Sequence, residues 1–285
     1  MKKHNGKIGI FDSGLGGLTI LREVVRLMPN REYVYLGDNL RAPYGNRTQK
    51  KIFAYTLAGV EWLFQQGAEI VILACNTASA NALRKIQQEV LPHKYPSKRV
   101  LGIIIPTAEE AIGFSKSGHV GVLATVATVL SGVFEKEVEK YSPEIKVSSQ
   151  SGGKLVELIE RNKNKKILQK EIENVTEKLI SKDALIDAII LGCTHYALIK
   201  NEIKKIVPKN ISVIEQGEIV AIKLSDYLKR HVEIRKRLSR ISSVCFYTTA
   251  DSDEVKKMMR QFYGKKISIS TVSYKIGAKL RCDGA

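Results

Sequence analysis

The chain has 285 residues, 44% of them hydrophobic, and a formal net charge of +17 at pH 7. This length suits two domains, and the composition is that of an ordinary globular protein. No apolar stretch approaches the ~18 residues of a membrane-spanning helix, and the apolar run Ile8–Phe11 is too short for a secretory signal. We therefore expect a cytoplasmic protein with no membrane partner.

Short apolar runs alternate with longer helical patterns along the chain. In chain order, the expected strands are Lys7–Phe11, Tyr33–Gly37, Ile70–Ala74, Val100–Ile104, Val120–Ala124, Ala188–Gly192, Ser212–Ile214 and Val244–Tyr247. The expected helices include Leu18–Met28, Thr48–Gln66, Ser79–Val90, Val129–Tyr141, Ile167–Lys182 and Glu218–Leu228. The alternation predicts an α/β fold of βαβ units, and the uniformly apolar strands predict mostly parallel sheets covered on both faces.

The chain also repeats itself. The segment KIGIFDSGLGGLTIL at 7–21 resembles HVGVLATVATVLSGV at 119–133, and ILACNTASANAL at 72–83 resembles ILGCTHYALI at 190–199. Chance similarity between apolar strands is the alternative, but the two pairs are offset by nearly the same number of residues. We therefore expect two similar α/β domains. The second comprises residues 99–209, and the first comprises 1–98 together with 210–285, which exceed what the second domain needs.

The basic residues are spread over several stretches and do not form one cluster. Lysine-rich helix faces or loops are expected at Arg161–Lys170, Lys200–Lys209, Lys229–Arg240 and Lys256–Lys266. This spacing is typical of a solvated surface, and no helix-turn-helix, zinc-finger or RRM signature accompanies it. Nucleic acid is therefore not the expected partner, although the charge of +17 leaves it open. A positive field also concentrates an anionic substrate.

Cysteine usage indicates reduced thiols and no zinc site. The four cysteines are Cys75, Cys193, Cys245 and Cys282. They are too few for a disulfide framework in a chain of this length, and no two have the C-x-x-C spacing of a structural zinc site. We expect no bound metal.

The first polar motif follows the first expected strand. Asp12 and Ser13 begin the segment DSGLGG, and ligands of open α/β sheets bind beyond the carboxyl ends of strands. The dinucleotide pattern G-x-G-x-x-G fails because Thr19 stands at its third glycine position. The glycines let the backbone approach a ligand, whereas a helix cap from Asp12 or Ser13 is the structural alternative.

The second motif combines Asp38, at the end of a strand, with the segment Pro43-Tyr44-Gly45. This segment has the composition of a turn. Tyr44 is equally compatible with a position over the mouth of a pocket, beside exposed backbone amides. The local pattern leaves both interpretations open.

Two cysteines occupy equivalent positions in the repeat. Cys75-Asn76-Thr77 and Cys193-Thr194-His195 each follow an apolar strand and begin an expected helix. A helix N-terminus favours the thiolate. Cys245 lacks polar followers and is expected in the core. His195, directly after Cys193-Thr194, is an acid-base candidate, with a satisfied structural histidine as the alternative.

Two equivalent thiols on opposite faces of a ligand suit a symmetric reaction. One thiolate removes a proton from a carbon atom, and the opposite thiol returns a proton from the other side, which inverts the stereocentre. The reverse reaction exchanges the two roles, so acid and base are expected to be the same residue type. A thiol with a reference pKa of ~8.5 needs modest tuning for this work. Asp12 and His195 are the expected helpers.

The segments IGIFDSGLGGLTIL, YLGDNLRAPYG, ILACNTASANAL and ILGCTHYALI together resemble the cofactor-independent aspartate/glutamate racemase family, and DSGLGG with PYG favours its glutamate branch. The resemblance implies two α/β domains in pseudo-twofold relation, with the active site in the cleft between them. It implies interconversion of L- and D-glutamate, which supplies D-glutamate for peptidoglycan, without pyridoxal phosphate or metal. Aspartate or another small acid is an alternative substrate, and a nucleic-acid-binding or regulatory protein is an alternative class. A homodimer is a further expectation.

Carried over by position, the resemblance assigns roles to individual residues. Cys75 is the proton acceptor for D-glutamate and Cys193 the acceptor for L-glutamate. The residues expected to tune the thiols are Asp12, Asp38, Glu160 and His195. The residues expected to bind the substrate are Asp12, Ser13, Pro43, Tyr44, Gly45, Asn76, Thr77, Thr194 and His195.

The chain departs from the family pattern at several positions. Gly152-Gly153 replaces a common Cys-Pro pair before the segment that holds Glu160, which makes the role of Glu160 less secure. Thr107 stands where many relatives have glycine after a proline. The segment VIEQGEIVAIKL replaces a more usual Asp-Ser-Gly version. None of the three involves the cysteines.

Overall fold

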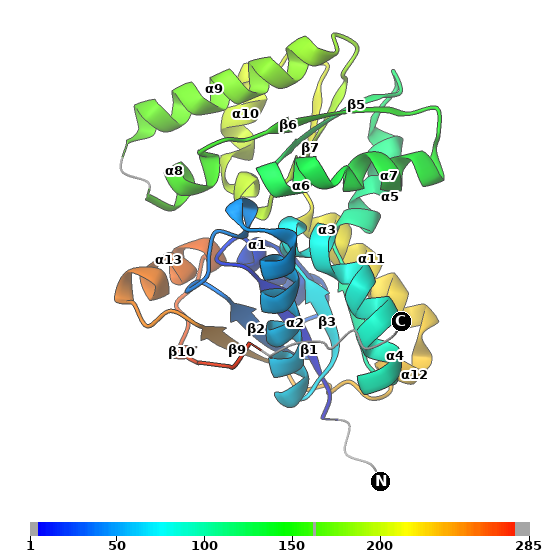
Figure 1. Ribbon diagram of the computed structural model, residues 1–285, viewed down its shortest axis with the longest axis vertical. Helices are drawn as coiled ribbons and strands as arrows, with labels where there is room; N and C mark the ends of the chain where they lie inside the picture. Colours follow the sequence, from blue (N-terminus) through cyan, green and yellow to red (C-terminus); the bar gives the residue numbers. More distant parts are fainter. Residues whose placement is uncertain (1–4, 162–163, 277–285) are drawn as a thin grey trace, which may run out of the picture.

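The computed structural model describes residues 5–161 and 164–276, which form two lobes, one above the other in Figure 1. Each lobe is built on one parallel sheet with helices on both faces. The first sheet has the strand order β10-β9-β2-β1-β3-β4, and the second has the order β6-β5-β7-β8. The predicted α/β fold with two mostly parallel sheets is therefore confirmed.

The first sheet contains six strands: β1 (Lys7–Asp12), β2 (Glu32–Gly37), β3 (Ala68–Leu73), β4 (Arg99–Gly102), β9 (Ser243–Thr248) and β10 (Ile269–Thr271). The second contains β5 (His119–Ala124), β6 (Lys146–Ser151), β7 (Ala188–Gly192) and β8 (Ser212–Ile214). The order β2-β1-β3-β4 recurs in the second sheet as β6-β5-β7-β8. Both cysteines of interest therefore follow corresponding strands, β3 and β7.

The lower lobe in Figure 1 contains the helices α1 (Gly17–Leu27), α2 (Gln49–Gln65), α3 (Asn76–Lys85), α4 (Leu91–Lys94), α11 (Gly217–Arg230), α12 (Val232–Arg235) and α13 (Asp253–Tyr263). It also has the short 3-10 helix η1 (Tyr44–Asn46) and the π-helical segment η2 (Ile86–Val90). The upper lobe contains α5 (Ile104–Phe114), α6 (Val126–Ser131), α7 (Val133–Tyr141), α8 (Leu155–Arg161), α9 (Lys165–Lys182), α10 (Lys200–Ile206) and η3 (Thr194–Ile199).

Strand β1 shows why both faces of the first sheet need helices. Successive side chains of a strand point to opposite faces. Ile8 and Ile10 lie in a core with the apolar side chains of α1, α11 and α13, whereas Phe11 lies in a second core with those of α2 and α3. All three are fully buried. The uniformly apolar sequence of the strand follows from this double coverage.

The chain crosses between the lobes twice. It passes to the second lobe between β4 and α5, and it returns between β8 and α11. The predicted division into residues 1–98 with 210–285 and residues 99–209 differs from the sheet membership at both boundaries. Strand β4 belongs to the first sheet, and strand β8 belongs to the second.

The structure differs from the predicted elements in three further places. The expected strand Val100–Ile104 ends at Gly102, and Ile104 begins α5. The expected helix Val129–Tyr141 is divided into α6 and α7 by Gly132, whose φ of 59° is left-handed. Strand β6, with the polar sequence KVSSQS, and the three-residue strand β10 were not predicted. None of the described helices has the length and apolar character needed to cross a membrane.

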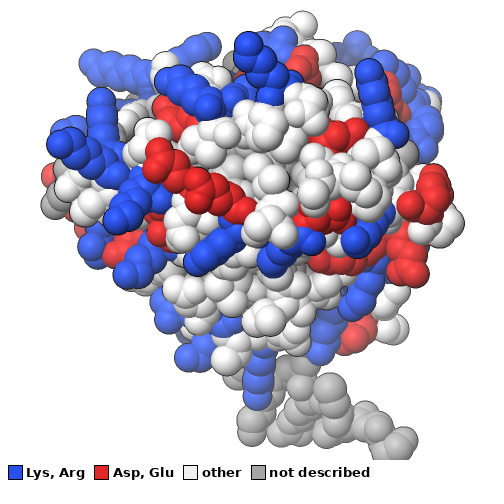
Figure 2. All heavy atoms as spheres, turned by 90° about the horizontal axis from the view of Figure 1, so that it is seen from above, with Lys and Arg blue, Asp and Glu red and all other residues white. Residues whose placement is uncertain are grey.

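Basic and acidic side chains are interspersed on the surface. On the face shown in Figure 2, Lys and Arg side chains alternate with Asp and Glu and with uncharged areas, and they do not form one continuous basic groove. Ion pairs such as Lys146–Asp183 and Lys140–Glu137 in the second lobe are part of this pattern. This arrangement fits the prediction of a solvated lysine-rich surface.

Candidate active site

The first group of site residues lies at the carboxyl end of β1. Asp12 is buried, and its Oδ2 accepts a hydrogen bond from the backbone N–H of Gly14 at 2.9 Å. Its Oδ1 has no hydrogen-bond partner. Burial raises the pKa of Asp12, because a buried carboxylate loses its hydration, and the nearby His195 opposes this change. The motif thus places a carboxyl group with a free oxygen at the strand end.

Cys75 follows β3 and caps the N-terminus of α3. Its Sγ lies 3.2 Å from Oγ of Ser13 and accepts a hydrogen bond from the N–H of Ala78 at 3.4 Å. Burial and the charge of Asp12 raise the pKa of Cys75 to about 12, whereas the contacts with Ser13 and Ala78 lower it. The thiol is therefore held as a neutral acid whose ionisation depends on these two donors.

Cys193 follows β7 and begins a three-residue chain of polar contacts. Its Sγ lies 3.9 Å from Nδ1 of His195, and Nε2 of His195 lies 2.9 Å from Oε1 of Glu160. Burial disfavours the charged imidazole, but the contacts with Cys193 and Glu160 raise the pKa of His195 to about 10. The raised pKa favours the protonated imidazole, which is a hydrogen-bond donor beside the sulfur of Cys193.

The two cysteines, one from each lobe, line the same cavity. Its volume is about 30 Å³. The residues around it are Ser13, Gly14, Ala42, Pro43, Tyr44, Gly45, Cys75, Asn76, Thr77, Thr125, Val156, Glu160, Cys193, Thr194 and His195. All the predicted site residues are among them except Asp12 and Asp38. Asp12 lies next to the cavity, because it precedes Ser13 and accepts a hydrogen bond from the N–H of Gly14, and both of these residues line the cavity.

Asp38 reaches the cavity through Tyr44. Its buried carboxylate accepts hydrogen bonds from the hydroxyl groups of Tyr44 at 2.6 Å and Thr249 at 2.9 Å, and it pairs with Arg41 at 2.6 Å. None of these contacts involves Cys75. Asp38 therefore holds Tyr44 at the cavity, and its expected role in tuning a thiol stays a prediction.

The Gly152-Gly153 departure has a packing reason. A Cβ atom at Gly152 would lie 2.1 Å from the hydroxyl oxygen of Tyr196, and Gly153 has a left-handed φ of 54°. The two glycines let the chain turn against the ring of Tyr196 before α8. This turn leaves Glu160 on α8 in contact with His195.

Some residues around the cavity were not anticipated. Thr125 accepts or donates a hydrogen bond with Thr77 at 2.9 Å, which joins the two lobes. It directly follows β5, so its position at a strand end was a usable signal. The side chain of Gln216 contacts Asn76 from the return crossover, and no local pattern indicated that contact.

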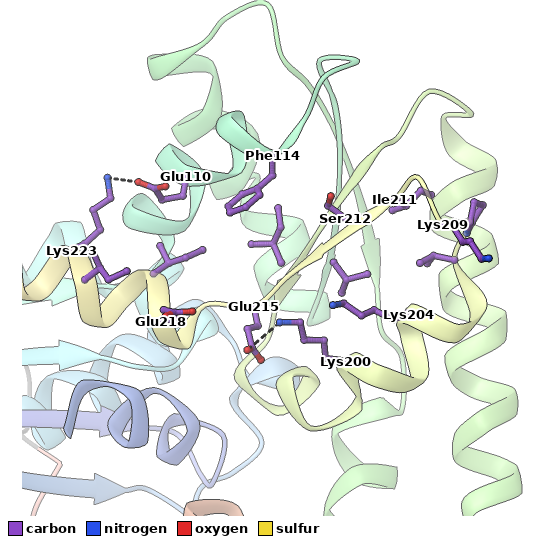
Figure 3. A pocket seen from close by; sticks show the side chains of 16 residues that line it. Glu110, Phe114, Lys200, Lys204, Lys209, Ile211, Ser212, Glu215, Glu218 and Lys223 are labelled. Atoms are coloured by element: carbon purple, nitrogen blue, oxygen red, sulfur yellow. Dashed lines mark ion pairs between the residues drawn. The ribbon is translucent and has the colours of Figure 1, made fainter. Parts of the chain in front are cut away.

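Two further features of the described residues bear on where a ligand could bind. Within 5–161 and 164–276, no group of three or more His, Cys, Asp or Glu side chains could hold a metal ion. A larger cavity of about 730 Å³ lies beside the return crossover, and its lining includes the apolar side chains of Phe114 and Ile211 (Figure 3). Its rim carries the ion pairs Glu110–Lys223 and Glu215–Lys200. Neither cysteine reaches it.

Comparisons with known proteins agree with the geometry. The sequence model of the Asp/Glu/Hydantoin racemase family matches residues 8–223. The chain is 35% identical to the glutamate racemase of Streptococcus gordonii over 269 residues, which cover 94% of this chain and 98% of the relative. It is 39% identical to the glutamate racemase of Paracoccus denitrificans over 266 residues, covering 90% and 96%.

Solved structures show the same similarity. The crystal structure of a glutamate racemase isoform from Bacillus anthracis matches with a TM-score of 0.85 and 32% identity, over 94% of this chain and 97% of that one. The glutamate racemase of Francisella tularensis, solved in complex with D-glutamate, matches with a TM-score of 0.81 and 30% identity, over 95% and 98%.

Proposed function

Because the chain belongs to the Asp/Glu/Hydantoin racemase family, we propose that it interconverts L-glutamate and D-glutamate at the cavity between Cys75 and Cys193. The reaction is an isomerisation, and its product D-glutamate serves peptidoglycan synthesis. The observation that carries the mechanism is the pair of thiols from opposite lobes on one cavity. Glutamate, and not another small acid, is favoured by the relatives compared above.

The proposed reaction needs only proton transfers. With L-glutamate, the Cys193 thiolate removes the Cα proton and becomes a thiol, while the Cys75 thiol donates its proton to the opposite face of Cα and becomes a thiolate. With D-glutamate, the two cysteines exchange roles. No electrons leave the system, so no oxidant or reductant is required. Each turnover leaves the cysteines in the protonation state that suits the opposite enantiomer.

The neighbouring groups support the two thiols in different ways. Protonated His195, held by Glu160, stabilises the thiolate of Cys193. The hydroxyl of Ser13 and the N–H of Ala78 stabilise the thiolate of Cys75. The expected binding groups Thr77, Tyr44 and Thr194 lie around the same cavity. The two sides of the site are thus chemically unequal although their strands correspond.

Substrate binding requires the lobes to separate. A volume of about 30 Å³ is that of one water molecule in the liquid, and glutamate is several times larger. Contacts between the lobes, such as Thr77 with Thr125, close the cavity in this conformation. We infer that the lobes open at the two crossovers, admit glutamate and close again, which also excludes water from the thiolates.

Optical rotation tests the proposed function directly. Purified protein with L-glutamate and no added cofactor is expected to lose the signal of the L-enantiomer, and in deuterated water the Cα hydrogen is expected to exchange during turnover. Cys75→Ser and Cys193→Ser should each abolish racemisation. A wild-type protein that leaves the rotation of L-glutamate unchanged contradicts the proposal. A panel with aspartate tests the alternative substrate.

Three expectations from the sequence stay predictions. A cytoplasmic location is checked by cell fractionation, and the homodimer by sedimentation of the purified protein. Salt-sensitive DNA binding that survives replacement of both Cys75 and Cys193 is the result that would support nucleic acid as a second partner.

A further inference from the structure

Gln216 occupies an unusual place in the fold. It lies in the return crossover between β8 and α11, next to Glu215, which pairs with Lys200 of the second lobe at 3.1 Å (Figure 3). The side chain of Gln216 is buried, with 2% of its surface exposed. A buried amide must find hydrogen-bond partners, so the identity of those partners determines what this residue does.

The amide of Gln216 joins three segments that are distant in sequence. Its Nε2 lies 3.0 Å from Oδ1 of Asn76, 3.1 Å from Oγ1 of Thr107 and 3.4 Å from the carbonyl oxygen of Ile103. Its Oε1 accepts a hydrogen bond from Nδ2 of Asn76 at 2.5 Å. One side chain therefore connects the return crossover, the outgoing crossover and the residue that follows Cys75.

The paired amides fix how Asn76 faces the cavity. Each amide donates a hydrogen bond to the oxygen of the other. A 180° rotation of the Asn76 amide group would therefore place its N–H groups against those of Gln216 and its oxygen against the oxygen of Gln216. One Nδ2 hydrogen of Asn76 is used by Gln216, and the second remains for another acceptor. Asn76 is buried and lines the cavity between the thiols. A carboxylate of the substrate is the acceptor that suits this hydrogen.

We propose that Gln216 is a positioning residue for racemisation, which holds the Asn76 amide as a hydrogen-bond donor to a glutamate carboxylate. The inference rests on the proposed function, because it needs glutamate in the cavity. Thr107 departs from the family pattern, and so does the segment that contains Gln216. The two side chains are in contact, so Thr107 helps to hold the amide of Gln216. Gln216 lies on the return crossover, and Thr107 lies in α5 just after the outgoing crossover.

Gln216→Leu tests the proposal, because leucine has a similar size and removes the amide. A hydrogen bond to a charged group contributes ~1.5–3 kcal/mol, so we expect KM for glutamate to rise about tenfold or more. The contact is made in the ground state and in the transition state alike, so kcat is expected to change less than about threefold. KM is expected to rise for both enantiomers, since the substrate carboxylates are bound in either direction.

A double-variant cycle separates positioning from a structural role. If Gln216 acts through Asn76, then Gln216→Leu should add little to the KM of Asn76→Ala, and the double variant should resemble the single ones. Gln216→Ser provides a second, smaller replacement if the leucine variant does not fold, and thermal unfolding identifies that case. Thr176→Val is the matched control, because the buried Oγ1 of Thr176 has no hydrogen-bond partner and lies on α9.

The outcomes distinguish the two proposals. A rise in KM that is absent when Asn76 is alanine supports the positioning role. An unchanged KM in both Gln216 variants, or effects of Gln216→Leu and Asn76→Ala that multiply, overturns it while wild-type racemisation leaves the proposed function intact. A wild-type protein without racemisation rejects the proposed function itself.

Discussion

Replacing Ser13 by alanine tests how the ionisation of Cys75 is controlled. The Ser13 hydroxyl lies 3.2 Å from Sγ of Cys75, and both side chains are buried. A hydroxyl that donates to sulfur stabilises the thiolate and not the thiol. Ser13→Ala removes this donor and leaves the N–H of Ala78 as the remaining hydrogen-bond donor to that sulfur.

The size of the effect follows from the lost hydrogen bond. A hydrogen bond to a charged group contributes ~1.5–3 kcal/mol, and one pKa unit corresponds to ~1.36 kcal/mol, so the pKa of Cys75 should rise by roughly one to two units. Near neutral pH, kcat/KM should fall by roughly 10- to 100-fold. The fall must be equal in both directions, because the two enantiomers of free glutamate have the same free energy.

Two measurements check this prediction. The rate of thiol alkylation at fixed pH reports the change in the pKa of Cys75 in a protein whose other three cysteines are serine, because the thiolate is the reactive form. Polarimetry gives kcat/KM from each enantiomer. Ser79→Ala is the control, because the buried hydroxyl of Ser79 donates to the carbonyl oxygen of Leu73 and has no contact with the thiol. An unchanged pKa of Cys75 in the Ser13 variant would refute the reasoning.

The remaining predictions concern the lobe contact and the second thiol. In deuterated water, Cys75→Ser should still exchange the Cα hydrogen of L-glutamate without racemising it, and Cys193→Ser should exchange that of D-glutamate, as magnetic resonance can show. Gly16→Ala should lower kcat/KM at least about tenfold, because its Cβ would lie 2.6 Å from Nδ1 of His195 and overpacking costs ~1–3 kcal/mol. In urea unfolding, Glu160→Gln should lower the stability most below pH ~6.5, and this loss should shrink as the pH rises towards 10. The pKa of His195 is raised in the folded state, so its contact with Glu160 stabilises the fold only while the imidazole is protonated.

Each of these predictions has a control or an opposing result. Gly113→Ala adds a Cβ with no atom within 4 Å on another surface of the molecule, so its activity should equal that of the wild type. Exchange of both enantiomers in a single-cysteine variant would contradict the assignment of one thiol to each face. A loss of stability in Glu160→Gln that grows from neutral to alkaline pH would show that the contact with Glu160 does not stabilise the protonated imidazole of His195.

The strongly apolar elements and the strand ends could be predicted from the sequence, because burial on both faces leaves an unbroken apolar run. Polar β6 has no such run, since its residues are only partly buried, and it escaped prediction. The boundary between β4 and α5 was misplaced because the apolar run continues without a break through the buried residues Ile103 and Ile104, although Ile104 begins a helix. A short apolar run does not distinguish a strand from a buried helix.

The site was predictable to the extent that its residues follow strands. Cys75 and Cys193 were found through their matched positions, and the cavity contains both. The partners of Asp38, Tyr44 and Thr249, could not be predicted, because they depend on where a loop and a distant strand end lie in space. The role of Gln216 likewise depends on contacts with residues more than one hundred positions away.

The late arrival of β9 in the first sheet has a consequence for synthesis of the protein. Strand β2 pairs on one side with β1 and on the other with β9, which begins only at Ser243. At roughly 5–20 residues per second, the ribosome completes every strand of the second sheet before that partner emerges. Until then the nascent chain carries an open edge at β2, which is an aggregation hazard. A premature stop before Ser243 therefore leaves the second lobe complete, whereas the first lobe, whose synthesis began earlier, lacks β9 and keeps β2 unpaired on one side.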